Sequence, residues 1–287
     1  MSDASDVVIR ALTDDGSFRV LTARTTGLCR EAVARQNARG ETARHFGDLL
    51  TGTVLVRETM APQLRVQGIV RGAGGGSTLV GDSFPDGGTR GLVSMKSGEA
   101  ELTLGGDAIM QFMRTMPNGA VHRGVVAVPQ RGGISEALMA YMQESEQILT
   151  VVGACTLFDE QGAVRSAGGY VVQLLPGADR EVVTVLTERL ALDFADISRF
   201  VGAENFDPDH LLDEILYRMP FARVETREVR FHCPCSLTSV LAGLATLDPR
   251  EIQGFIDEGQ LLEIACEYCG ADYQVAPDQL RGLLSAS

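Results

Sequence analysis

The sequence contains no uninterrupted apolar run near the roughly 18 residues that a membrane-spanning helix requires. Its first residues, Met1 to Asp6, are polar and acidic, so the apolar segment of a secretory signal is not visible there. We therefore expect a cytoplasmic protein with no membrane partner. In that compartment, closely spaced cysteines are typical of metal or redox chemistry rather than of a structural disulfide framework.

Basic residues are scarce where a nucleic-acid binder would need them. Lys96 is the only lysine among 287 residues, and the net charge is −13. Residues 231–287 hold eight acidic side chains against two arginines, a balance of −6. Binding to nucleic-acid phosphates depends on Lys and Arg. We therefore expect no nucleic-acid partner.

The common catalytic motifs are also absent. The sequence has no Gly-x-Ser-x-Gly turn, no His-Glu-x-x-His zinc motif and no Walker phosphate loop. The glycine-rich stretch 72–77 lies between two predicted strands and is not followed by Gly-Lys-Ser/Thr, so we interpret it as a strand connector. The four histidines are scattered along the chain: His45, His122, His210 and His232. The sequence therefore predicts no catalytic residues, no organic cofactor and no enzyme activity.

Four of the six cysteines form two short pairs near the C-terminus. One residue separates Cys233 from Cys235, and thirty residues later two residues separate Cys266 from Cys269. Four thiolates brought together match the ligand set of a closed tetrahedral Zn²⁺ site, which has no open position for catalysis. The sequence therefore predicts one zinc ion bound by these four residues.

The other two cysteines, Cys29 and Cys155, fall in apolar segments and are predicted to be core residues.

The length of the chain favours more than one domain. The sequence pattern predicts an α+β protein in three parts. Residues 1–177 are expected to form a mixed α/β domain with a largely antiparallel sheet, because strand patterns follow one another with few helices between them. Residues 178–230 are expected to form a helical linker, and residues 231–287 a small zinc-binding domain. The elements predicted in the first part are a hairpin over 7–23, two helices over 26–55 that break near Gly40, strands within 63–128 that include 101–104, a helix over 134–145, and strands over 148–158 and 170–175.

The linker has the pattern of two amphipathic helices. Apolar side chains recur every three or four residues from Val183 to Val201, which predicts one long helix. Asp207 followed by Pro208 predicts the start of a second helix. Such helices are not stable alone in water, so we expect them to dock on the first domain or on another chain. The stability of the linker would then be conditional.

Residues 231–287 form too small a domain to be stable without an additional stabilising interaction. Ser236 and Asp248 are predicted N-caps of two short helices, and strands are expected around Leu261–Ile264 and Tyr273–Val275. Zinc binding can contribute about 10–16 kcal/mol to the folding of such a module, whereas a whole domain is usually stable by about 5–15 kcal/mol. Oxidation of the thiolates to disulfides would eject the metal and unfold the module. Unfolding of the module could in turn release the linker helices.

Several segments resemble the redox-regulated 33-kDa bacterial heat-shock chaperonin (holdase) family. The strongest resemblance is the spacing of Cys233, Cys235, Cys266 and Cys269, together with the surrounding stretches 229–235 and 266–270. Weaker similarity covers 141–148 and 169–176. The resemblance implies an ATP-independent chaperone for stress conditions that is inactive when reduced and zinc-loaded. It also implies disulfides Cys233–Cys235 and Cys266–Cys269 on oxidation, with loss of zinc, an unfolded linker, and a homodimer that holds unfolding client proteins.

Three other interpretations remain open from the sequence. A thiol–disulfide oxidoreductase would use Cys266 and Cys269, although such pairs usually lie at a helix N-terminus. A zinc-ribbon nucleic-acid binder conflicts with the acidic charge of residues 231–287. A purely structural zinc site would brace the module without any response to oxidants.

Overall fold

The computed structural model describes residues 5–285 and confirms an α+β fold with antiparallel sheets, helices and a C-terminal cluster of four cysteines. The chain forms two compact units, Met1–His232 and Cys233–Ser287. Among the described residues, no helix combines the length and the apolar character needed to cross a membrane.

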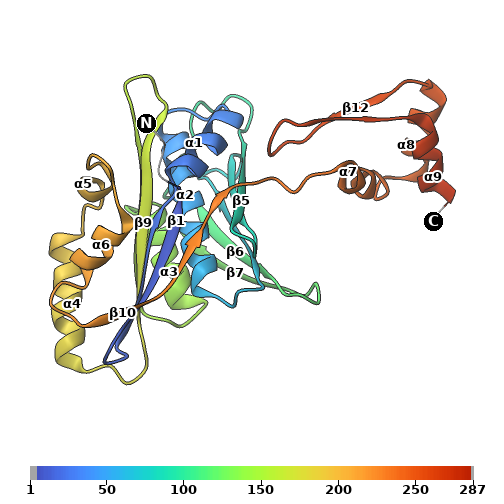
Figure 1. The fold of residues 1–287 in the computed structure, drawn as a ribbon. Coiled ribbons are helices and arrows are strands. Elements are labelled where there is room, and N and C mark those ends of the chain that lie inside the picture. The colour runs from blue at the N-terminus through green and yellow to red at the C-terminus, as the bar shows by residue number, and fades with distance from the viewer. Residues whose placement is uncertain (1–4, 286–287) are drawn as a thin grey trace. The chain divides into compact units, whose positions relative to one another are not determined.

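The first unit contains a five-stranded antiparallel sheet with the order β10-β1-β2-β9-β8 (Figure 1). Its strands are β1 (Val7–Thr13), β2 (Phe18–Arg24), β8 (Thr150–Phe158), β9 (Val164–Leu174) and β10 (Phe221–Glu228). The predicted hairpin at the N-terminus is confirmed as β1 and β2, with Gly16 at φ 70° in the turn. Such a positive φ suits glycine, which lacks a Cβ.

A six-stranded sheet with the order β11-β5-β4-β3-β6-β7 forms the other layer. Its strands are β3 (Arg65–Arg71), β4 (Thr78–Ser83), β5 (Gly88–Ser94), β6 (Ile109–Thr115), β7 (Val121–Ala127) and β11 (Arg230–Phe231). All pairings are antiparallel except that of β11 with β5. The stretch 72–77 connects β3 to β4, as predicted, with its ends joined by a bond from the amide of Gly72 to the carbonyl of Ser77.

Helices α1 (Thr26–Arg35), α2 (Gly40–Thr59) and α3 (Ile134–Glu144) build the core with these sheets (Figure 1). Helix α2 contacts strands of both sheets, and most of its residues are buried all around the helix. Such all-round burial is typical of a helix inside a core rather than on a surface. The break between α1 and α2 lies where predicted, with positive φ angles at Asn37 and Gly40.

The predicted linker helices lie on the outer face of the five-stranded sheet. They are α4 (Arg180–Asp193), α5 (Ser198–Val201) and α6 (Pro208–Ile215), and they bury a second apolar cluster against β1, β2 and β9. This segment belongs to the first compact unit. The division into 1–177, 178–230 and 231–287 stays a prediction. It assumes that residues 178–230 are less stable than the rest of the first unit, which the structure does not test.

Two predicted elements differ in the structure. Residues 101–104 form no strand, because the amide of Leu102 bonds to Thr42 Oγ1 while its side chain enters the core. The single helix predicted from Val183 to Val201 is broken after Asp193. A turn in which the Asp196 carboxylate accepts the amide of Ser198 redirects the chain into α5.

Strand β10 was missed in the segment predicted to be helical. None of its eight residues is buried. Arg223, Glu225 and Arg227 give it a charged surface. Charged side chains are a common feature of exposed edge strands. Only its pairing with β1, with a bulge opposite Arg10 and Ala11, identifies it as a strand.

The second unit has a small core of its own. It contains α7 (Leu237–Leu244), α8 (Pro249–Glu258), the hairpin of β12 (Leu262–Ala265) and β13 (Asp272–Val275), and the unpredicted α9 (Pro277–Ser285). The predicted caps are confirmed: Ser236 accepts from the amide of Ser239, and Asp248 from that of Arg250. Four apolar side chains are buried in the described part of this unit, namely Ile252, Ile256, Val275 and Leu280. So small a core favours an additional brace.

Candidate metal centre

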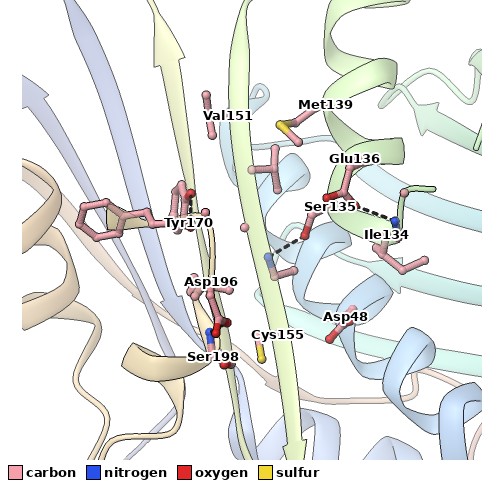
Figure 2. A pocket seen from close by; sticks show the side chains of 18 of the residues that line it. Asp48, Ile134, Ser135, Glu136, Met139, Val151, Cys155, Tyr170, Asp196 and Ser198 are labelled. Carbon is pink, nitrogen blue, oxygen red and sulfur yellow. Dashed lines mark hydrogen bonds between the residues drawn. The ribbon is translucent and has the colours of Figure 1, made fainter. Parts of the chain in front are cut away.

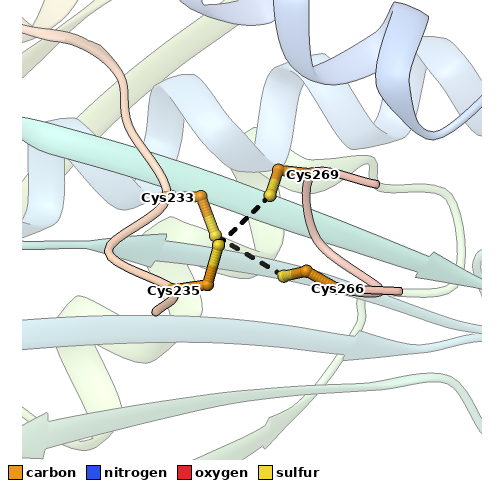
Figure 3. Close-up of side chains that lie close together, drawn as sticks. All are labelled: Cys233, Cys235, Cys266 and Cys269. Atoms are coloured by element: carbon orange, nitrogen blue, oxygen red, sulfur yellow. Dashed lines mark hydrogen bonds between the residues drawn. The ribbon is translucent and has the colours of Figure 1, made fainter. Parts of the chain in front are cut away.

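The four predicted cysteines converge in the second unit. Their sulfur atoms all lie within 4.8 Å of one another, and each side chain is partly buried. Cys233 Sγ lies 3.8 Å from Cys266 Sγ, and Cys235 Sγ lies 3.4 Å from Cys269 Sγ (Figure 3). Both of these close pairs join one arm, Cys233–Cys235, to the other arm, Cys266–Cys269.

These distances fit a tetrahedral zinc site. A Zn–S bond of about 2.3 Å places tetrahedral sulfurs about 3.8 Å apart. Four cysteine sulfurs are also the ligand set typical of structural zinc. The residues present could therefore hold one metal ion, consistent with zinc.

Local backbone structure positions each arm. Cys233 and Cys235 follow β11 and precede α7, which Ser236 caps. Cys266 and Cys269 lie in the turn between β12 and β13, where the amide of Gly270 bonds to the carbonyl of Cys266 at 2.7 Å. Gly270 has φ 72°, the positive value that the sequence suggested for a glycine after such a pair.

Hydrogen bonds make one of the thiols distinct. Tyr273 Oη donates to Cys235 Sγ at 3.1 Å. Burial opposes ionisation, but the hydrogen bonds from Tyr273 and the neighbouring thiols lower the pKa of Cys235 to about 7. Burial, with the proximity of the other sulfurs, raises the pKa of Cys269 to about 12. Sequence reasoning missed Tyr273, whose only signal was its position four residues after Cys269.

The position of Cys266 and Cys269 does not favour an oxidoreductase. In such enzymes a helix N-terminus typically lowers the pKa of the attacking cysteine. Here the pair lies in the turn of a β-hairpin, between β12 and β13.

The first unit contains a groove of about 850 Å³ that runs along β8 and is also lined by α2, α3, α4 and α5 (Figure 2). Cys155 lies in it and is only partly buried, so the prediction of a core residue holds less well there than for the fully buried Cys29. Burial raises the pKa of Cys155 and that of Cys29 to about 12. Both thiols thus stay protonated near neutral pH and are poor nucleophiles.

The same groove borders a buried carboxyl group. Asp48 is almost fully buried, and burial raises its pKa to about 7, although Thr156 and Arg44 act in the opposite direction. Of the predicted scattered histidines, His45 lies one turn before Asp48 on α2, and burial lowers its pKa. The described thiol in the groove, that of Cys155, has a raised pKa, and we assign the groove no reaction.

Comparison with known proteins identifies the family to which the chain belongs. The family model described as "Hsp33 protein" matches residues 6–276. The 33 kDa chaperonin of Symbiobacterium thermophilum is 30% identical over 289 residues, with 96% of each chain covered. That of Bacillus subtilis is 26% identical over 288 residues, covering 97% of this chain and 98% of the relative. The crystal structure of the 33 kDa chaperonin from Thermotoga maritima superposes with a TM-score of 0.81 at 23% identity, over 99% of both chains. The chain therefore belongs to the Hsp33 protein family.

Proposed function

We propose that this protein is a redox-regulated, ATP-independent holdase, which binds unfolding proteins during oxidative and heat stress. The proposal rests on the convergence of four cysteine sulfurs within a unit whose described residues include only four buried apolar side chains. A site of this kind would be the main stabilising interaction of the unit and also the part that oxidants attack most readily. The names of the chaperonin relatives support the chaperone function.

The reduced state would be the inactive one. Bound zinc would hold all four sulfurs as thiolates and fill its coordination shell with them. Cys233, Cys235, Cys266 and Cys269 would then brace the arm before α7 against the β12–β13 hairpin. Because the shell is closed, we assign no enzyme activity to the site.

Oxidation would remove this brace if each arm forms its own disulfide. Cys233–Cys235 and Cys266–Cys269 disulfides tie residues within one arm and leave the two arms unlinked. A disulfide sulfur is no longer a thiolate ligand, so zinc would be lost along with about 10–16 kcal/mol of folding free energy. That contribution is as large as the whole stability of a typical domain, which is about 5–15 kcal/mol.

The linker helices cover the surface that would hold clients. Helices α4, α5 and α6 bury apolar side chains of the five-stranded sheet, among them Val20, Tyr170 and Val172. Their cluster is substantial, so we expect loss of the metal to release these helices only at elevated temperature. Heat combined with oxidation would expose the apolar sheet face. An exposed apolar patch of this kind binds the apolar segments of other unfolding chains.

The proposal extends to partners and location. The clients would be partly unfolded proteins, and the oxidised form would be a homodimer in the cytoplasm. Nucleic acid is not an expected partner, because residues 231–287 carry a balance of −6.

The test is an aggregation assay with a thermally denatured client. We expect hydrogen peroxide at mildly elevated temperature to release zinc and to make the protein suppress aggregation, and a thiol reductant with zinc to reverse both effects. A Cys29→Ser/Cys155→Ser variant is the matched control, because it keeps the four clustered cysteines and should respond as the wild type does. Equal suppression by the reduced, zinc-loaded protein would refute redox control. Turnover in a disulfide-reduction assay, lost in Cys266→Ser, would instead support the oxidoreductase.

A further inference from the structure

A hydrogen bond from the β12–β13 hairpin reaches the Cys233–Cys235 arm without the aid of a metal. Tyr273 lies on β13 opposite Ile264 of β12, in the hairpin whose turn carries Cys266 and Cys269. Its hydroxyl donates to Cys235 Sγ, which belongs to the other arm, at 3.1 Å. The contact therefore fixes the position of Cys235 relative to the hairpin.

The start of β13 supplies a donor to each arm. The backbone amide of Ala271 donates to the sulfur of Cys269, two residues before Tyr273 reaches Cys235. The carbonyl of Ala271 also accepts the amide of Cys266 at 2.8 Å. Of these contacts, only the one from Tyr273 is made by a side chain, so a substitution can remove it without a change in the backbone.

A hydrogen bond to a thiolate weakens its reactivity. The donated proton stabilises the negative charge on sulfur, so less electron density is available to attack an oxidant. Groups that hydrogen-bond to metal ligands also orient them, and their removal typically costs about 10–100-fold in metal affinity. Both effects would act on Cys235.

We propose that Tyr273 is a positioning residue that sets the oxidation threshold of the Cys233–Cys235 arm and strengthens zinc binding at the four-cysteine site. This inference rests on the proposed function, because it concerns the same sulfurs. Nothing in it requires Tyr273 to be consumed or to change its protonation state.

The oxidation that Tyr273 would slow balances with peroxide as the oxidant. The thiolate of one cysteine attacks a peroxide oxygen, the O–O bond breaks, and a sulfenic acid forms as hydroxide leaves and is protonated to water. The thiol of the second cysteine then attacks the sulfenic sulfur, forms the S–S bond and expels a second water. Two thiols lose two electrons and two protons, and one peroxide is reduced to two waters.

The test uses the full-length chain with Tyr273→Phe, which keeps the ring and removes the hydroxyl. Zinc affinity is measured by competition with a chromogenic chelator, and the oxidation of each arm by timed alkylation and mass spectrometry during peroxide treatment. We expect zinc binding about 10-fold weaker, and faster oxidation of Cys233 and Cys235 with a smaller change at Cys266 and Cys269. Tyr217→Phe removes an exposed hydroxyl from the first unit and should match the wild type in both measurements.

A third measurement separates positioning from folding. The cobalt(II)-loaded variant should keep the absorption of tetrahedral four-thiolate coordination, with the charge-transfer band shifted by the loss of the hydrogen bond. Loss of the tetrahedral spectrum would show that Tyr273 is needed for the fold and would overturn the inference. The inference would also be overturned if Tyr273→Phe left zinc affinity and the oxidation of Cys233 and Cys235 unchanged. In that case the proposed function would still stand, provided that the wild type releases zinc on oxidation. If the wild-type protein keeps its zinc and all its thiols under peroxide, both the proposed function and the proposed role of Tyr273 in the oxidation threshold are refuted.

Discussion

Tyr170 of β9 and Phe194 at the end of α4 meet edge to face, with ring centroids 6.1 Å apart. The ring of Phe200 of α5 stacks on that of Phe194, with a centroid distance of 4.9 Å. Aromatic pairs of this geometry contribute about 0.5–1.5 kcal/mol beyond their buried area. The contact fastens the predicted linker to the five-stranded sheet at the point where the chain bends from α4 into α5.

Replacing a buried side chain of α4 by a smaller one should weaken the attachment of this helix to the sheet. Leu190 is 5% exposed and packs in the cluster on the outer sheet face, whereas Leu192, two residues later, is 80% exposed. Leu190→Ala should lower the free energy of unfolding by about 2–5 kcal/mol. Leu192→Ala is the matched control and should stay within about 0.5 kcal/mol of the wild type. Urea denaturation measures both, and equal effects would contradict the described packing.

The same pair of variants tests the role of the linker in activation. If release of α4 to α6 exposes the client-binding face, oxidised Leu190→Ala should suppress aggregation at a lower temperature than the oxidised wild type. Leu192→Ala should not shift that temperature. A lower temperature in both variants, or in neither, would argue against the outer sheet face as the client-binding surface.

Asp48 should make stability depend on pH. Its pKa of about 7 in the folded chain lies above the ordinary value of 3.8, so between these values the folded state binds a proton that the unfolded state has lost. Stability should therefore fall as the pH rises from about 4 to about 7, by up to about 4 kcal/mol at about 1.4 kcal/mol per pKa unit. Asp48→Asn should lack this decline. Urea midpoints of the two proteins across this range measure it, and parallel curves would refute the shift.

Glu58 of α2 is the centre of an ion-pair network that reaches β10, where Arg227 Nε lies 3.8 Å from Glu58 Oε1. Arg10 of β1 contacts Glu58 Oε2 at 3.2 Å and Glu225 Oε2 of β10 at 2.8 Å. Glu58 is almost fully buried and also pairs with the buried Arg57, whereas Glu225 is exposed. Glu58→Gln should destabilise the first unit by about 3–5 kcal/mol, because it leaves the buried guanidinium group of Arg57 without a countercharge. Glu225→Gln serves as the control, with an expected loss below about 1 kcal/mol in the same denaturation experiment.

The connectivity of the oxidised cysteines decides whether oxidation opens or locks the second unit. In the reduced structure two close sulfur pairs join the two arms, Cys233 to Cys266 and Cys235 to Cys269. Disulfides between the arms would keep the unit folded, whereas disulfides within each arm would free it. We predict Cys233–Cys235 and Cys266–Cys269 in peptide mapping of the active, oxidised protein. A client-holding protein with disulfides between the arms would contradict the proposed unfolding.

The sequence allowed the prediction of the elements whose patterns arise from local chemistry. The turn at Gly16, the caps at Ser236 and Asp248 and the cysteine pairs all depend on residues near one another in the chain. The elements that were missed depend on distant partners. Strand β10 is identified only by its pairing with β1, and Leu102 enters the core from a loop because Thr42 binds its amide. Tyr273 has functional interest only because folding brings its hydroxyl to Cys235.

The most direct test of the central claim is the zinc content and free-thiol count of the protein before and after peroxide treatment at elevated temperature, measured on the samples used for the aggregation assay. We predict one zinc and six cysteine thiols that react with a thiol reagent after denaturation in the inactive reduced protein, given its six cysteines. We predict no zinc and two free thiols, those of Cys29 and Cys155, in a protein that holds the client. Full client holding by samples that retain their zinc and all their thiols would contradict the central claim.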